Sequence, residues 1–406
     1  MRVLVMCRVS DRLARYADGI DHTTHDVTYV GTAEQVARLP PDLPGSRLVR
    51  PGVANSADEI LTALSGRSRP DLVVALSEFD LMDAARVRQE LGVPGDDPAQ
   101  VRLVRDKVAM KTAVRQAGLR VPRFLPLPDA LARQDGVPWT GATVVKPRAG
   151  LASIDVDVFD TPDAALAALR GGAHARAGVD DFEIEEFVAG PIIHVDGVAV
   201  ADKPVALQVS RYVGTCLGYA RGKPLGSVQI DTDPALVEWA TACLHAVRIG
   251  TNIFHLEAIH GPDGPVFLEV AGRFGGAGVV ETFELATGVH LPSTVQKYWT
   301  NPEHVDISMR EPRPDGRYGW FVWPGHHLDG DSCAIDDPTG TLTHPLVRRH
   351  VRRRPTEPLT RDITYQEDRA PLSGTIGPAS SEQLERYLHR QFTTARISAR
   401  APGRHP

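Results

Sequence analysis

Glu257 and Glu269 are placed so that their two carboxylates could bind one metal ion. Each ends an apolar run, and the turn His260–Asp263 separates the two runs. Antiparallel pairing of two such strands brings residues from both onto one face of a sheet. Two unpaired carboxylates on a buried face repel each other and are poorly solvated, so a divalent cation would stabilise them. Oxygen ligands of this kind favour Mg²⁺, or Mn²⁺ in its place. A pair of exposed glutamates at a sheet edge is the alternative, and the spacing alone leaves it open.

Two lysines stand where phosphate groups could be bound. Only six residues of the chain are lysine, against 39 arginines. Lys107 lies near the start of a helix expected from Val101 to Ala117, and Lys146 ends an apolar strand, Ala142–Pro147. The loop Arg148–Ser153 that follows is rich in small residues, whose backbone N–H groups can approach an anion closely. A surface lysine beside an ordinary turn is the alternative for each position when it is taken alone.

Arg273 supplies a fixed positive charge beside the proposed metal pair. It follows Glu269 by four residues and precedes Gly275 and Gly276, whose backbone N–H groups are expected to be free. A cation and free N–H donors together stabilise an oxyanion that forms during a reaction. The lysines, the small-residue loop and the two carboxylates together fit a nucleoside triphosphate with Mg²⁺.

Composition excludes several other classes of protein. The chain has 406 residues, a net charge of −6 and 42% hydrophobic residues, so a large core is expected and a general nucleic-acid binder is not. No apolar run approaches the roughly 18 residues of a membrane span. The four cysteines show no metal-binding spacing, and without a recognisable secretion signal we expect reduced thiols in a cytoplasmic protein.

The helices and strands that must position these residues are predicted to form an α/β protein. Apolar runs at 2–7, 26–30 and 71–76 alternate with helical patterns, which favours a parallel sheet. Further on, the runs at 182–188, 192–200 and 204–212 are expected to form successive antiparallel strands. The segment from about residue 310 is richer in Pro, Arg and Gly, and the last residues, 396–406, are expected to be an unstructured tail.

The ordered set of residues resembles the ATP-grasp superfamily. The resemblance rests on Lys107, on Lys146-Pro147 with its small loop, on Glu185-Glu186-Phe187-Val188-Ala189-Gly190, and on the two glutamates of the hairpin. Within the superfamily, Arg105-Asp106-Lys107 and the Glu269–Arg273 spacing are most similar to carboxylate–amine ligases of the L-amino acid (dipeptide) ligase type. The fold that this resemblance implies has an N-terminal Rossmann-like parallel α/β domain (1–98), an ATP-grasp small subdomain (99–190) and large subdomain (191–309), and a small C-terminal subdomain (310–395).

The resemblance also implies roles for individual residues. Lys107 and Lys146 would contact the phosphates of ATP. The mobile phosphate loop would include Arg148, Ala149 and Ser153. The adenine would be read by the side chain of Glu185 and by the segment Glu186, Phe187 and Val188. Mg²⁺ would be held by Glu257 and Glu269. The acyl phosphate and the oxyanion would be stabilised by Arg273, Gly275 and Gly276.

The sequence departs from the superfamily pattern at two places. Ala271 stands where many members have an asparagine metal ligand, and no glutamate for the ribose follows Gly190. His194 or Asp196 could replace that glutamate, and a purely structural histidine is the alternative for His194. Glu78 follows a strand of the parallel sheet, at an edge where ligands bind in such folds, although it could equally belong to the next helical turn. The weakest candidates for substrate contact are Ser210, Arg211 and Tyr212.

The expected activity is therefore an ATP-dependent carbon–nitrogen ligase. A small-molecule carboxylate, activated as an acyl phosphate, would be joined to an amine, with amino acids as the expected substrates and with no nucleic acid or membrane as partner. A homodimer is the expected assembly. Three alternatives stay open: an ATP-grasp carboxylase or purine-pathway-type ligase with another acceptor, a non-catalytic ATP-binding module, and an unrelated α/β enzyme.

Overall fold

The N-terminal segment forms a four-stranded parallel sheet, as its apolar runs predict. The computed structural model describes residues 1–172, 178–305 and 307–400. The strand order is β3-β2-β1-β4, with bounds Arg2–Met6 (β1), Asp26–Gly31 (β2), Ser46–Val49 (β3) and Leu72–Ala75 (β4). The helices of this segment are α1 (Asp11–Ala14), α2 (Tyr16–Gly19), α3 (Ala33–Ala37), α4 (Ser56–Leu64), α5 (Leu81–Leu91) and α6 (Pro98–Arg102).

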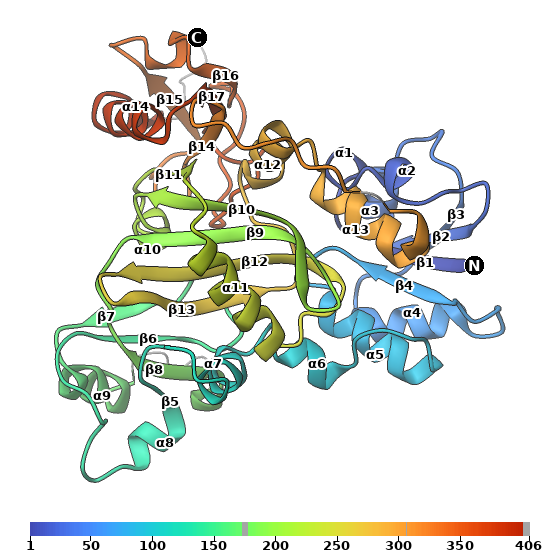
Figure 1. Cartoon of the computed structure of the whole chain (residues 1–406), viewed down its shortest axis with the longest axis horizontal. Coiled ribbons are helices and arrows are strands. Elements are labelled where there is room, and N and C mark those ends of the chain that lie inside the picture. The colour runs from blue at the N-terminus through green and yellow to red at the C-terminus, as the bar shows by residue number, and fades with distance from the viewer. Residues whose placement is uncertain (173–177, 306, 401–406) are drawn as a thin grey trace.

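Both faces of this sheet are buried. One face packs against the α4–α6 side, where Leu4 and Val73 meet Ile60. The other face packs against α1 and against a helix from much later in the chain, α13 (Leu291–Thr300). The side-chain amide of Gln296 in α13 donates to the backbone oxygen of Ala14 at 2.8 Å. Figure 1 shows α13 lying beside the N-terminal segment, where it contacts α1 and α2.

An eight-stranded sheet, antiparallel throughout, forms the centre of the molecule (Figure 1). Its strand order is β13-β12-β9-β10-β11-β14-β17-β16. The bounds are Ile192–Val200 (β9), Lys203–Val213 (β10), Leu225–Gln229 (β11), Asn252–Gly261 (β12), Gly264–Ala271 (β13), Arg317–Trp323 (β14), Val347–Arg352 (β16) and Leu372–Ala379 (β17).

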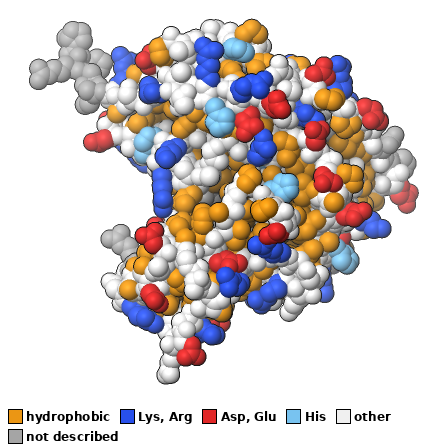
Figure 2. Space-filling model, turned by 60° about the vertical axis from the view of Figure 1, so that its left-hand side comes forward, with side chains coloured by type: hydrophobic (Ala, Val, Ile, Leu, Met, Phe, Trp, Pro, Cys, Tyr) orange, Lys and Arg blue, Asp and Glu red, His pale blue; other side chains and the backbone are white. Residues whose placement is uncertain are grey.

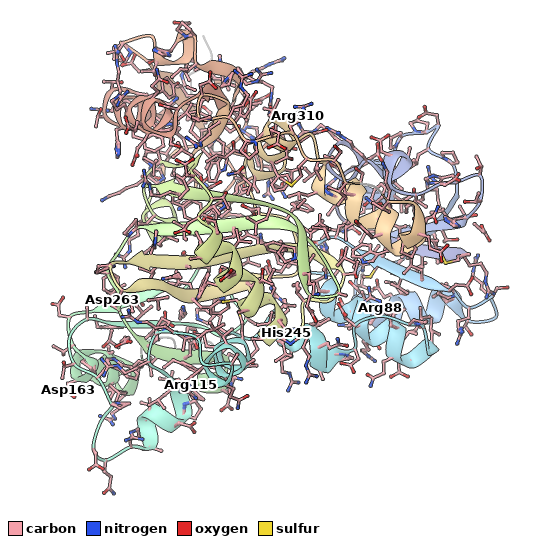
Figure 3. All side chains as sticks on the ribbon, in the orientation of Figure 1. Arg88, Arg115, Asp163, His245, Asp263 and Arg310 are labelled. Carbon is pink, nitrogen blue, oxygen red and sulfur yellow. The ribbon has the colours of Figure 1, made fainter. Side chains whose placement is uncertain are left out.

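The alternation of side chains along β12 separates a core from a site. Phe254 and Leu256 point into a buried cluster that includes Met110 of α7 (Lys107–Gln116) and Leu244 of α11 (Pro234–Ala246). His255 points to the opposite face, because successive side chains of a strand alternate. In Figure 3, Asp263 marks the turn of the β12–β13 hairpin and His245 the end of α11, at opposite ends of this sheet. The alternate residues of β12 therefore face a different environment from the core.

A smaller antiparallel sheet carries the predicted phosphate-binding strand. Its order is β5-β8-β6-β7, with bounds Phe124–Pro126 (β5), Thr143–Pro147 (β6), Asp157–Phe159 (β7) and Phe182–Glu186 (β8). The helices α8 (Leu127–Ala132) and α9 (Pro162–Arg170) cover it around a separate apolar cluster. We expected the strand at 182–188 to pair with the next one in the chain. Instead β8 pairs with β5 and β6, because the turn after Glu186 takes the chain to another sheet.

The C-terminal segment completes the large sheet and forms a second, two-stranded one. Helix α14 (Ser381–Thr394) packs on β11, β14 and β17. The expected unstructured tail from residue 396 is wrong in its first part: Arg396–Arg400 form β18, which pairs with β15 (Ser332–Asp336). Residues 401–406 lie outside the described residues. The remaining helices are α10 (Cys216–Ala220) and α12 (Val279–Thr287), with short 3-10 turns at Val179–Asp181, Pro302–His304 and Thr341–Thr343.

One predicted helix is two helices in the structure. The sequence predicts a single helix from Val101 to Ala117, but α6 ends at Arg102 and α7 begins at Lys107. The carboxylate of Asp106 accepts from the backbone N–H groups of residues 108 and 109 at 3.0 and 3.2 Å. Such a side chain satisfies the free N–H groups of a helix start. The break therefore places Lys107 in the first turn of a helix.

The surface and the helix lengths agree with the composition. In the face shown by Figure 2, acidic and basic side chains are interspersed, and neither sign forms a continuous area. Among the described residues, every helix is too short or too polar to span a bilayer. The predicted domain bounds stay predictions, although the described strands fall into a parallel sheet and three antiparallel ones.

Candidate active site

Glu257 and Glu269 lie directly opposite each other on β12 and β13, as the hairpin predicts. The hydroxyl of Tyr212 donates to Glu257 Oε1 at 2.7 Å, and His255 Nε2 lies 3.2 Å from the same oxygen. The ammonium of Lys107 lies 2.8 Å from Glu269 Oε2. Burial raises the pKa of Glu269, but Lys107, Lys146 and Arg273 together outweigh it and lower the pKa to about 2. Glu269 is therefore an anion that already attracts a cation.

This carboxylate pair fits a magnesium ion by its chemistry. Both groups present hard oxygen donors on one face of the sheet, which suits Mg²⁺ better than a soft metal. A cation, the ammonium of Lys107, already sits against Glu269. Ala271, at the position of the superfamily's asparagine, has no ligand atom in its side chain. A bound ion would therefore use the two glutamates, with the remaining ligands coming from phosphate oxygens and water.

Lys107 also fixes the predicted phosphate loop. Its ammonium donates to the backbone oxygen of Gly150 at 2.8 Å, and its backbone N–H donates to the oxygen of Arg148 at 2.8 Å. The guanidinium of Arg148 binds both oxygens of Asp106, at 2.5 and 3.1 Å. Ala152 and Ser153 have φ of 57° and 54°, a backbone conformation in which neighbouring N–H groups can form an anion-binding concavity. The loop is thus held to the start of α7 at one end and strongly turned at the other.

A groove of about 690 Å³ lies beside this loop. The residues that line it include Phe79, Arg148, Gly150, Ile154 and Asp181. Phe79 is 62% exposed, which is unusual for a phenylalanine. Ala149 is also exposed. The predicted loop therefore borders an open cavity between the N-terminal segment and the small sheet.

Lys146 belongs to a buried group of four charged side chains. Its ammonium lies 2.6 Å from Glu185 and 3.8 Å from Glu183. Lys111, which is fully buried, binds Glu183 at 2.9 Å and also binds Glu185. Burial raises the pKa of Glu185, but Lys111 and Lys146 reverse the shift and lower the pKa to about 2. For Glu183 burial is the stronger effect, and its pKa is raised.

The arrangement changes the expectation for Glu185. We expected its carboxylate to face an adenine amino group, but it is 3% exposed and lies between two ammonium groups. Glu186 instead carries an ion pair with Arg123 at 2.6 Å, and Phe187 is 48% exposed. Val188 is half-buried. Recognition of adenine by the segment 186–188 stays a prediction, and Glu185 is better described as a partner of Lys146.

Arg273 connects the metal pair to the N-terminal segment. Its Nε lies 2.6 Å from the carboxylate of Glu78, which also binds Arg105. Burial raises the pKa of Glu78, but Arg273 and Arg105 outweigh it and lower the pKa. The carboxylate of Glu78 holds the guanidinium of Arg273, and contact of Glu78 with a substrate stays a prediction. Gly275 and Gly276 follow in the loop after β13.

His194 does not offer a nitrogen for a ribose hydroxyl in this structure. Its Nδ1 lies 2.5 Å from Asp196, and its Nε2 lies 2.7 Å from the hydroxyl of Ser227. The ring is 1% exposed and lies against the ring of Tyr212, with centroids 4.6 Å apart. Asp196 also binds His255 at 2.7 Å. Burial lowers the pKa of His255, but Asp196 and Glu257 reverse the shift and raise it to about 9.

The three weakest candidates divide between the two faces of β10. Ser210 and Tyr212 point to the face of the carboxylates, and Tyr212 contacts Glu257. Arg211 points the other way and pairs with Glu385 of α14 at 2.5 Å. The structure therefore does not support substrate contact beside the carboxylates for Arg211, because adjacent residues of a strand cannot share a face.

Sequence reasoning gave no role to several residues that the structure brings to the site. These are Arg105, Lys111, Glu183, Ser227 and His255. Two signals were present in the chain. Lys111 is one of only six lysines, and His255 lies two residues before Glu257, on the same face of a strand.

The chain was also compared with known proteins. No family model matches it. It is 22% identical over 278 residues to the L-arginine-specific L-amino acid ligase of Bacillus subtilis, covering 63% of each chain. It is 25% identical over 253 residues to an uncharacterised protein, y4rH, of Sinorhizobium fredii. The chain spans 63% of the length of the Bacillus subtilis ligase and 49% of the length of y4rH.

Solved structures match over almost the whole chain. The L-amino acid ligase of Bacillus licheniformis superimposes with a TM-score of 0.72, at 18% identity, and covers 98% of both chains. The N5-carboxyaminoimidazole ribonucleotide synthetase of Thermotoga maritima superimposes with a TM-score of 0.64, at 17% identity, over 98% of this chain and 99% of the other. This agreement extends from the parallel sheet to the C-terminal strands, and it confirms the predicted architecture. The chain has the ATP-grasp fold.

Proposed function

We propose that the chain is an ATP-dependent ligase that joins a carboxylate to an amine. One observation carries this proposal: on adjacent strands, Glu257 and Glu269 face each other beside Lys107 and Arg273. This arrangement supports a divalent-cation site with a phosphate-binding cation and an oxyanion-binding cation beside it. The likeness to L-amino acid ligases supports amino acids as the substrates.

The reaction would begin with the transfer of a phosphoryl group. A carboxylate is a poor electrophile, so its oxygen attacks the γ-phosphorus of ATP, ADP leaves, and an acyl phosphate forms. Lys107 and Lys146 would bind the phosphates, which requires both ammonium groups to exchange their present glutamate partners for phosphate oxygens. Mg²⁺ held by Glu257 and Glu269 would supply charge neutralisation of the phosphates.

Amide formation would follow at the same place. The amine attacks the acyl carbon, phosphate leaves, the amine loses a proton and the amide forms. Arg273 would stabilise the oxyanion, and Glu78 would hold the guanidinium in position through its contact at 2.6 Å. The loop at 148–153 would close over the acyl phosphate and keep water away. The groove beside this loop is a suitable entrance for the substrates.

The direct test measures release of ADP and phosphate from ATP and Mg²⁺ across a matrix of amino acids. Amino acids are supplied singly and in pairs, products are identified by mass, and Glu269→Gln is the matched inactive control. We expect release that requires two amino acids and a product lighter than their sum by one water. Absence of turnover with every pair, while ATP still binds, would contradict amino acids as the substrates.

A second acceptor class follows from the likeness to the purine-pathway synthetase. In that case the acyl group would be carboxyphosphate made from bicarbonate. The same assay with bicarbonate and candidate amines distinguishes the two classes, since only this alternative makes ADP release dependent on bicarbonate. Complete lack of nucleotide turnover would favour a non-catalytic ATP-binding module.

A further inference from the structure

Two residues, Arg105 and Lys107, hold the start of the phosphate loop through its backbone oxygens. The oxygen of Arg148 accepts from the backbone N–H of Lys107 at 2.8 Å, and the oxygen of Gly150 accepts from the ammonium of Lys107 at 2.8 Å. Between them, the oxygen of Ala149 accepts from the guanidinium of Arg105 at 3.3 Å. Three successive carbonyl groups of the loop are therefore bound by the short segment that opens α7.

Arg105 is the member of this pair that also reaches the N-terminal segment. Its guanidinium binds Glu78 Oε1, and the guanidinium of Arg273 binds the other oxygen, Oε2, at 2.6 Å. The side chains of Arg105, Glu78 and Arg273 are 15%, 12% and 22% exposed, so these contacts are only weakly screened by salt and water. One continuous set of contacts thus runs from Ala149 through Arg105 and Glu78 to Arg273.

Two arginines on different oxygens restrict the orientation of the Glu78 carboxylate. The last torsion of a glutamate side chain has a broad energy minimum, so a single partner leaves the carboxylate free to turn. With Arg105 bound to Oε1, a rotation that moves Oε2 away from Arg273 also breaks the contact with Arg105. Arg105 therefore restricts the position of Arg273 through the carboxylate that both arginines share.

The link through Arg105 remains when the link through Lys107 is broken. In the proposed reaction the ammonium of Lys107 exchanges Glu269 for a phosphate oxygen, and its contact with Gly150 competes with the same phosphate. The partners of Arg105 are a carboxylate and a carbonyl of the protein, and phosphate binding by Lys107 replaces neither of them. With ATP bound, Arg105 therefore still joins the phosphate loop to Arg273.

We propose that Arg105 is a positioning residue that couples closure of the phosphate loop to the placement of Arg273. This inference rests on the proposed ligase function and adds a residue that acts through others. When the loop closes over the acyl phosphate, its carbonyl at Ala149 is bound to the guanidinium that also orients Glu78. Exclusion of water and stabilisation of the oxyanion then occur together. Without Arg105, the acyl phosphate meets water before the amine attacks.

The first test compares Arg105→Ala with the wild-type protein in the assay of ADP, phosphate and amide. Affinity for ATP, measured by calorimetry, should change little, because Arg105 binds no phosphate in the proposed reaction. The kcat for amide formation should fall by about 10–100-fold, since a misplacement of about 1 Å can cost this much. ADP should also be released in excess over amide. One amide for each ADP at the wild-type rate would overturn the proposal.

Two further variants separate this role from a general loss of charge. Arg105→Lys keeps the charge, but its single ammonium lacks the planar fork that reaches Glu78 and Ala149 together, so it should also release excess ADP. Arg115→Ala removes an exposed arginine of α7 and should keep the wild-type ratio of amide to ADP. A wild-type ratio in Arg105→Lys would show that charge alone is sufficient and would contradict the proposed link.

A double variant tests whether Arg105 acts through Glu78. Glu78→Gln keeps the shape of the side chain and removes its charge, so it should slow amide formation on its own. If both residues belong to one set of contacts, Arg105→Ala should slow the reaction much less in Glu78→Gln than in the wild-type protein. Losses that simply multiply in the double variant would mean that Arg105 acts separately, against the proposal.

A measurement without turnover separates this inference from the ligase. Hydrogen–deuterium exchange is followed with Mg²⁺ and the β,γ-imido analogue of ATP. Arg105→Ala should exchange faster than wild type at 148–153 and at 272–276, and should match it in the eight-stranded sheet, which shows that the variant is folded. Unchanged exchange at both segments in an enzyme that ligates contradicts only the role of Arg105. Faster exchange at both, when even the wild-type protein makes no amide, contradicts only the ligase.

Discussion

The ammonium of Lys107 lies 2.8 Å from the carboxylate of Glu269 and joins the first turn of α7 to β13. In the proposed reaction these residues have different partners, a phosphate oxygen and a magnesium ion. In the protein alone, Lys107 therefore occupies the place of the magnesium ion beside Glu269, and Glu269 occupies the place of the phosphate beside Lys107. Binding of Mg²⁺ and ATP would exchange one ion pair for two, so the nucleotide and the metal should bind cooperatively.

Glu269→Gln should lose Mg²⁺-dependent turnover. The amide cannot supply the negative oxygen that a hard divalent cation prefers, and the loss of metal-assisted phosphoryl transfer costs several kcal/mol, or at least about 100-fold in rate. ADP release measured across a magnesium titration checks this. Glu238→Gln, a change on the exposed side of α11, is the matched control. An unchanged magnesium dependence in Glu269→Gln would move the metal site elsewhere.

Arg273→Ala should separate nucleotide binding from amide formation. The guanidinium pairs with Glu78 and is not one of the two cations proposed to bind the phosphates, so affinity for ATP, measured by calorimetry, should change little. Amide formation should fall by about 10²–10³-fold, the usual loss when an oxyanion-stabilising group is removed. Ligation by Arg273→Ala at nearly the wild-type rate would exclude this role.

Lys111→Met should destabilise the fold strongly. The ammonium is fully buried between Glu183 and Glu185, and its removal leaves two buried carboxylates with one lysine. Breaking a buried pair in this way typically costs about 3–5 kcal/mol, which denaturant unfolding can measure. The double change Lys111→Met/Glu183→Leu removes the pair together and should recover most of the stability. If the double variant is as unstable as the single one, the packing of Lys111 matters more than its charge.

Glu59 should make stability depend on acid pH. Its carboxylate accepts from the backbone N–H groups of residues 52, 53 and 54 and binds Arg50 at 2.8 Å. The hydrogen bond from residue 54 and the contact with Arg50 lower its pKa to about 2. A lowered folded-state pKa gives stability that is complete above the ordinary value near 4.5 and is lost as pH falls towards 2.

The variant Glu59→Gln tests this contribution. Urea unfolding at a series of pH values should show the largest difference from wild type above about pH 5, shrinking as the pH falls, because both chains are then uncharged at this position. A difference that stays constant between pH 5 and pH 2 would assign the effect to packing instead.

The sequence predicts best what local pattern determines. The hairpin that brings Glu257 opposite Glu269 follows from two apolar runs and a short turn, and the structure has this register. The position of Lys146 at the end of a buried strand follows in the same way. In each case the deciding information lies within about a dozen residues of the chain.

What the sequence did not predict depends on contacts between distant segments. From the sequence, Glu185 is expected to have a free carboxylate beside a turn. Only the packing of α7 brings Lys111 against it. The start of α7 also illustrates a local signal that was missed, since Asp106, the residue before the helix, is a good helix-capping residue. The strand at 396–400 pairs with β15, sixty or more residues earlier, so its own polar sequence gave no sign of it.

Helix α13 makes the parallel sheet a product of two distant parts of the chain. Leu291 and Val295 cover the face that carries Val5 and Tyr29, and Gln296 is bonded to Ala14. A fragment ending near residue 98 would keep every strand of that sheet but would lose the part of its apolar cover that α13 provides. The unit that looks separable in the sequence therefore lacks part of its own core, and we expect its strands to reach full stability only after α13 has been synthesised.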